Sequence, residues 1–97
     1  MTNAIVALCT IEFHLPGVAS LKEKRSILKS MLARLGNKFN AASAEIDHHD
    51  RWQSAIVAIV TVSNSTRHAH QVIANIVEWI ESRYPDAEIV NQEIEIL

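Results

Sequence analysis

Glycine and proline are scarce in this sequence, at two residues each among 97. Because these residue types supply most tight turns, few loops are expected and the helices and strands should be long. Cysteine occurs once, so no disulfide can form within the chain, which fits a reducing compartment. Aromatic residues make up only 5% of the chain, which leaves little material for a sheet that stacks RNA bases on exposed rings.

Long apolar runs are also absent. No segment could span a bilayer, and the first residues lack the basic flank of a signal peptide. The formal net charge of -2 argues against a uniformly basic nucleic-acid binder, although a local basic patch is compatible with it. Apolar residues at 48% and charged residues at 21% are typical of a globular domain. We therefore expect one cytoplasmic domain over residues 1–97 with no membrane segment.

Hydrophobic periodicity predicts six elements in the order strand, helix, strand, strand, helix, strand. The first helix should begin with a capping box, in which Ser20 is followed three residues later by Glu23, and Gly36 is a suitable residue for its C-terminal end. The second helix should be capped by Asn64 or Ser65. The predicted ranges are 4–15, 20–36, 40–47, 55–63, 65–83 and 88–97.

The apolar pattern of the strands indicates how they are arranged. Strands 4–15 and 55–63 are apolar on both faces, whereas strands 40–47 and 88–97 alternate between apolar and polar residues. Strands that are buried on both sides belong at the centre of a sheet, and alternating strands suit its edges. This predicts an α+β fold of the ferredoxin-like βαββαβ type, an antiparallel sheet of order 4-1-3-2 with both helices on one face.

No catalytic signature is present. The chain has no G-x-S-x-G, no phosphate-binding loop and no C-x-x-C, and two glycines are too few to cradle a phosphate chain. We therefore expect no enzymatic activity, no catalytic residues, no cofactor and no bound small molecule.

The first helix carries most of the positive charge. Residues 22–38 contain six of the nine Lys and Arg residues and one acid, Glu23. On a helical wheel Lys22, Arg25 and Lys29 form one stripe, with Lys24 on the other side of the apolar face and Arg34 elsewhere. Such a surface could hold the phosphates of RNA. The alternatives are a solvated flank whose side-chain stems cover the edge of the core, or an adaptor surface for an acidic protein.

A second polar cluster lies between the second and third strands. If the strand continues, alternate residues Glu45, Asp47 and His49 point the same way and could weakly bind a divalent ion. The alternative is a polar hairpin over residues 47–53, in which Trp52 anchors the loop and which serves as an adaptor surface. We expect no tightly bound metal. The candidate residues of this patch are Asp47, His49, Asp50 and Trp52.

A third surface follows from the predicted topology. With both helices on one side, Val6 and Leu8 of the first strand and one apolar face of the third strand are left on the other side of the sheet. A contiguous apolar patch is rare on a monomer and usually marks an interface. We predict a homodimer through this face, since a twofold dimer is the commonest assembly.

Seven short segments, spread over nearly the whole chain, together form a recognisable pattern. The more specific of these are Ser-Leu-Lys-x-Lys-Arg at residues 20–25 and Asp-x-Trp-Gln at residues 50–53. The others are His-Leu-Pro at 14–16, Phe-Asn at 39–40, Ala-Glu-x-Asp at 44–47, Val-Ser-Asn at 62–64 and Glu-Ile-Glu-Ile-Leu at 93–97. In these segments the chain resembles the YlxP-like family of small bacterial proteins.

The resemblance implies a ferredoxin-like fold and no activity, because the family is classed as a domain of unknown function. Its genes often neighbour genes of translation initiation and ribosome maturation, which indicates an RNA or ribosome setting by association. Two positions depart from the family pattern. Members often have a basic residue where Gly36 stands, which weakens the basic patch here, and often have Gln where His49 stands, so a metal role for His49 would not be a family trait.

Overall fold

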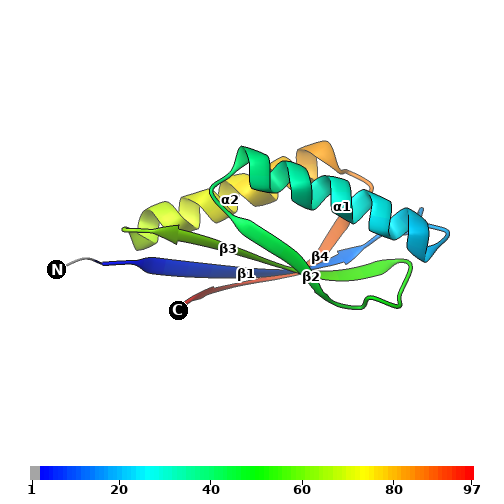
Figure 1. Ribbon diagram of the computed structural model, residues 1–97, viewed down its shortest axis with the longest axis horizontal. Coiled ribbons are helices and arrows are strands. Elements are labelled where there is room, and N and C mark those ends of the chain that lie inside the picture. The colour runs from blue at the N-terminus through cyan, green and yellow to red at the C-terminus, as the bar shows by residue number, and fades with distance from the viewer. Residues whose placement is uncertain (1–2) are drawn as a thin grey trace.

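The computed structural model describes residues 3–97 and contains the six elements in the predicted order (Figure 1). Within these residues, no helix has both the length and the apolar character needed to cross a membrane. The elements are β1 (Ile5–His14), α1 (Leu21–Lys38), β2 (Ala42–Asp47), β3 (Ser54–Ser63), α2 (Thr66–Arg83) and β4 (Glu88–Ile96).

The four strands form one antiparallel sheet of order β2-β3-β1-β4, with both helices on one side of it (Figure 1). Counted from the opposite edge this is 4-1-3-2, so the predicted ferredoxin-like topology is confirmed. The long central strands β1 and β3 pair without interruption from Ile5 opposite Ser63 to His14 opposite Ser54.

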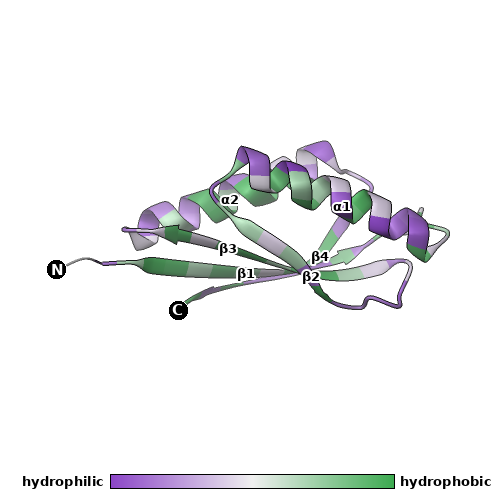
Figure 2. Ribbon diagram, viewed as in Figure 1, coloured by the Kyte–Doolittle hydropathy of each residue, from purple (hydrophilic) through white to green (hydrophobic). Residues whose placement is uncertain are grey.

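The core lies between the sheet and the helices. Alternate residues of β1, from Ala7 to Phe13, are fully buried against the helices, because successive side chains of a strand point to opposite faces. The buried side of α2 packs on them through Ala69, Ile73, Ile76 and Ile80. Figure 2 shows long hydrophobic stretches on β1 and α2, whereas α1 alternates between hydrophobic and hydrophilic segments.

At the N-terminal ends of both helices, the observed caps are residues that the sequence predicted. The Ser20 hydroxyl accepts a hydrogen bond from the Glu23 backbone N–H at 3.1 Å, and the Glu23 carboxylate accepts one from the Ala19 N–H at 3.2 Å. Of the two candidate caps for α2, the structure has Ser65, whose hydroxyl accepts from the His68 N–H at 3.3 Å.

The predicted end of α1 is wrong. Gly36 lies inside the helix, which continues to Lys38 and is closed by Phe39, whose N–H donates to the Leu35 carbonyl at 2.9 Å. The ring of Phe39 packs edge-to-face on Trp79 of α2, with ring centroids 5.7 Å apart. Phe39 and Trp79 are forty positions apart in sequence, so this is a tertiary contact. It stabilises the continuation of α1 past Gly36, a residue type with low helix propensity.

Candidate functional site

The basic stripe of α1 is exposed. Lys22, Arg25 and Lys29 all face solvent, and their spacing of three and four residues aligns them along one flank of the helix. Arg34 is also exposed, but its position around the helix separates it from the stripe. Within residues 3–97, none of these four side chains forms an ion pair. Their charges are therefore available to a partner.

Lys24 does not belong to this surface, and its assignment to the nucleic-acid-binding residues is wrong. Its side chain is 0% exposed, because it continues the buried stripe of Leu28, Met31 and Leu35 towards the start of α1. The basic residues of the Ser-Leu-Lys-x-Lys-Arg segment thus have two different roles. Lys22 and Arg25 face outward, while Lys24 faces the sheet.

The Lys24 ammonium group is held by four oxygen acceptors from β2, β3 and the loop between them. Nζ donates to the Glu45 carboxylate at 2.9 Å and to the His48 carbonyl at 2.8 Å, with longer contacts to the carbonyls of His49 at 3.4 Å and Ser54 at 3.3 Å. An ammonium group is stable in a buried site only when it is paired and hydrogen-bonded, and this arrangement provides both. Lys24 therefore ties α1 to the β2–β3 connection.

The β2–β3 loop is shaped around this contact. His48 has a φ of 64°, in the left-handed region, where histidine is one of the more tolerated residues. Its N–H donates to the Asp47 carboxylate at 2.7 Å, and its ring Nδ1 lies 2.6 Å from the Ser54 hydroxyl. Gln53 fixes the other end, because its side-chain amide donates to the carbonyls of Pro16 at 3.2 Å and Val18 at 3.1 Å.

The expected alignment of Glu45, Asp47 and His49 is wrong. A register shift between Glu45 and Asp47 places Glu45 opposite the buried Val57 and Asp47 opposite Ile56, on the other face of the sheet. A β-bulge breaks strict alternation in this way because two residues of one strand oppose one residue of its partner. Glu45 is bound to Lys24, and no group of three or more His, Cys, Asp or Glu residues able to hold a metal occurs within residues 3–97.

The candidate patch in the β2–β3 loop is exposed, and one expectation about the loop needs correction. Asp47, His49 and Asp50 face solvent. Trp52 is 52% exposed and is not the anchor that the hairpin interpretation expected. The loop is held instead by the hydrogen bonds of Gln53 and Lys24. Whether this patch binds a partner stays a prediction.

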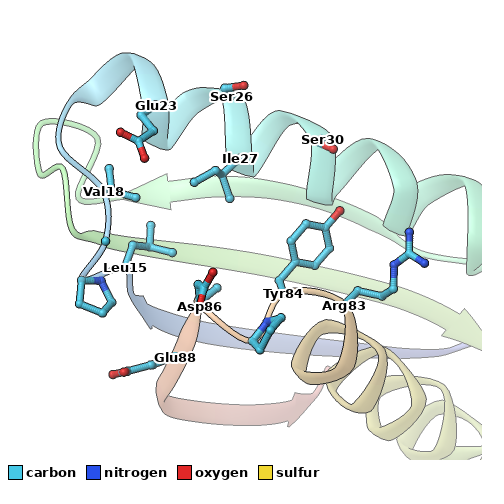
Figure 3. A pocket seen from close by; sticks show the side chains of 14 residues that line it. Leu15, Val18, Glu23, Ser26, Ile27, Ser30, Arg83, Tyr84, Asp86 and Glu88 are labelled. Atoms are coloured by element: carbon cyan, nitrogen blue, oxygen red, sulfur yellow. The ribbon is translucent and has the colours of Figure 1, made fainter.

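Sequence reasoning missed a groove between α1 and the connection from α2 to β4 (Figure 3). It has a cavity volume of about 670 Å³, with Leu15, Val18 and Ile27 among its apolar lining and Arg83 at one end. The ring of Tyr84 points towards α1, and its buried hydroxyl has no hydrogen-bond partner among the described residues. Two segments far apart in sequence, residues 15–30 and 83–88, form this groove, so no local motif could have revealed it.

The sheet surface that faces away from the helices is called the open face below. Val6 and Leu8, the predicted dimer residues, lie on it directly opposite Val62 and Val60 of β3. Val62 is 55% exposed, and Ala42 of β2 extends the apolar area by pairing with Val60. Homodimerisation through this face stays a prediction.

Cys9 is fully buried in the core, and burial raises the pKa of its thiol to about 11. Because the thiolate is the reactive form, roughly one molecule in a thousand would carry it at pH 8. We expect the folded protein to resist Ellman's reagent and to react fully once it is unfolded in guanidinium chloride. Rapid reaction of the folded protein would contradict this burial.

Comparison with known proteins agrees with the resemblance seen in the sequence. The family model described as "Protein of unknown function (DUF503)" matches residues 6–94. The uncharacterized protein YlxP of Bacillus subtilis (strain 168) is 39% identical over 69 residues, which are 71% of this chain and 74% of that protein. Among solved structures, the de novo designed protein Foldit4 is similar with a TM-score of 0.55 over 98% of this chain and 97% of its own, at 11% identity, so that likeness concerns the fold alone. The chain therefore belongs to the DUF503 family and is a relative of YlxP.

Proposed function

We propose that this protein is a non-enzymatic binding protein whose α1 stripe, Lys22, Arg25 and Lys29, contacts the phosphate backbone of RNA. The observation that carries the proposal is the exposure of three aligned cations that form no ion pair within residues 3–97. Cations in the first turn of a helix are also unfavourable to its dipole, which applies to Lys22 and supports a role other than helix stability.

Charge segregation supports the same proposal. None of the four strands contains a Lys or Arg residue, whereas α1 contains six. A local positive field on α1 is therefore compatible with the net charge of -2. Ribosomal RNA is the RNA class that the resemblance to the family suggests.

The expected mode of binding is contact with phosphates rather than with bases. Phe13, the aromatic residue of the central strands, is fully buried, so the sheet offers no ring from these strands for base stacking. Phosphate contacts position a protein without reading sequence. About three contacts on duplex RNA should give a log–log salt slope of roughly -2 to -3, using the coefficient for duplex DNA.

The test compares two triple variants of equal net charge in a ribosome co-sedimentation assay and in titrations with RNA. The first carries Lys22→Glu, Arg25→Glu and Lys29→Glu. The matched control carries Arg51→Glu, Arg67→Glu and Arg83→Glu, which are exposed positions outside α1. We expect the first variant to lose binding and the control to retain most of it.

Two outcomes would contradict the proposal. If both variants lose binding equally, net charge alone governs association and α1 has no special role. If the wild-type protein binds no RNA at any salt concentration, the hypothesis of RNA binding is rejected. The alternative, a protein-interaction adaptor that uses α1 or the 47–53 hairpin, then replaces it.

A further inference from the structure

The open face carries charge of one sign beside its apolar area. Glu95 lies opposite the apolar Leu8, and Glu93 lies opposite Thr10, the next residue of β1 on the same face, so the two carboxylates border the apolar area. Glu12 of β1 continues this row opposite Asn91. We call Glu12, Glu93 and Glu95 the acid row.

The rest of the open face contains no Lys or Arg, because none of the four strands does. Glu88 pairs with His14 at 3.3 Å, and Asp47 adds a further carboxylate on β2, at the opposite edge. The apolar part of the face consists of Val6, Leu8, Ala42, Ala44, Ile56, Ala58, Val60 and Val62.

We propose that the open face binds an amphipathic helix with a basic flank, supplied by a partner protein. The apolar stripe of such a helix would lie along β1 and β3, and its Lys or Arg residues would lie over the acid row. The central strands are ten residues long, or roughly 33 Å at 3.3 Å per residue. A helix of about 22 residues has the same length, at 1.5 Å per residue.

Charge complementarity favours this occupant over a second copy of the chain. Two open faces packed together would bring two sets of carboxylates into one interface that has no Lys or Arg to neutralise them. Like charges brought together at an interface oppose association. A helix with a basic flank covers the apolar area and neutralises the acid row at the same time.

The open face is also distinct from the surface proposed for RNA. The acid row repels phosphate, and it lies on the side of the sheet opposite to α1 (Figure 1). Binding of a basic helix therefore does not depend on RNA binding by α1, and a protein that did both would join an RNA to a basic protein segment.

The test uses a fluorescein-labelled synthetic peptide of about 22 residues. Leucine recurs in it at helical spacing and lysine occupies one flank. A twin peptide has glutamate in place of every lysine. Binding is measured by fluorescence anisotropy against the full-length protein at physiological salt. The key variant is Glu93→Gln with Glu95→Gln, and the matched control is Glu78→Gln with Glu81→Gln, at exposed positions of α2.

We expect saturable binding of the lysine peptide, weakened about tenfold by the Glu93 and Glu95 substitutions and unchanged by the α2 control. The glutamate twin should bind at least about ten times more weakly than the lysine peptide, because it meets like charge. Val62→Ser should also weaken the lysine peptide, since it removes apolar contact at an exposed position. Circular dichroism checks that each variant is folded.

Three results would overturn the proposal. One is an absence of saturable binding of the lysine peptide, and another is equal binding of the two peptides. The third is a mass of two chains in light scattering that Leu8→Glu returns to one chain, which would assign the open face to a second copy, as the sequence predicted. RNA binding should be unchanged in the Glu93 and Glu95 variant, which separates this test from that of α1.

Discussion

Lys24→Met should lower the free energy of unfolding by about 3 kcal/mol, the lower end of the range for breaking a buried ion pair. The substitution keeps the length and apolar volume of the side chain but removes the ammonium group. The Glu45 carboxylate, whose side chain is 15% exposed, then loses its cation, and the carbonyls of His48 and Ser54 lose a donor. The lower end of the range of destabilisation is appropriate because the Glu45 side chain keeps some contact with solvent.

Equilibrium unfolding in urea, followed by circular dichroism, measures this loss. Lys22→Met is the matched control, since it makes the same chemical change two residues away at an exposed site and should cost less than about 0.5 kcal/mol. Adding Glu45→Gln to Lys24→Met should recover part of the loss, because the buried charge without a partner is removed. Equal stabilities of the two single lysine variants would show that the Lys24 contacts contribute nothing.

Trp79→Ala should lower the free energy of unfolding by about 2–3 kcal/mol, below the usual cost for a fully buried tryptophan because Trp79 is only partly buried. Its ring stands edge-to-face between Phe39 and Tyr84, with centroid distances of 5.7 Å to each and interplanar angles of 73° and 72°. Each such pair contributes about 0.5–1.5 kcal/mol beyond the area it buries. These contacts join the end of α1 to the end of α2.

Trp52→Ala provides the control for this substitution. Trp52 lies in the β2–β3 loop and is 52% exposed, so its loss should cost less than about 0.5 kcal/mol. The same denaturant titration ranks both variants against the wild-type protein. A cost for Trp52 as large as that for Trp79 would mean that the loop tryptophan has packing contacts which the structure does not show.

These predictions affect how the segments shared with the family are interpreted. Within residues 20–25, Ser20 caps α1 and Lys24 is buried, whereas Lys22 and Arg25 are exposed. Gln53, in the other specific segment, holds two loops together. Some residues shared with the family therefore stabilise the fold. Only the exposed residues of these segments can contact a partner directly.

The sequence by itself determined the order of the elements, the N-terminal cap of α1 and the central positions of β1 and β3. These features follow from local spacing and from the burial pattern of single elements, which are readable along the chain. The basic stripe of α1 was predictable for the same reason, since residues three and four apart share one face of a helix.

Tertiary structure alone decided which basic side chains of α1 are available to a partner. The acceptors around Lys24 come from residues that lie 21 to 30 positions further along the chain, so no helical wheel could distinguish its burial from exposure at the margin of the core. The bulge between Glu45 and Asp47 and the register of β4 against β1 likewise set which carboxylates share a face. Strand register depends on pairing between distant segments, and a shift of one residue moves a side chain to the other side of the sheet.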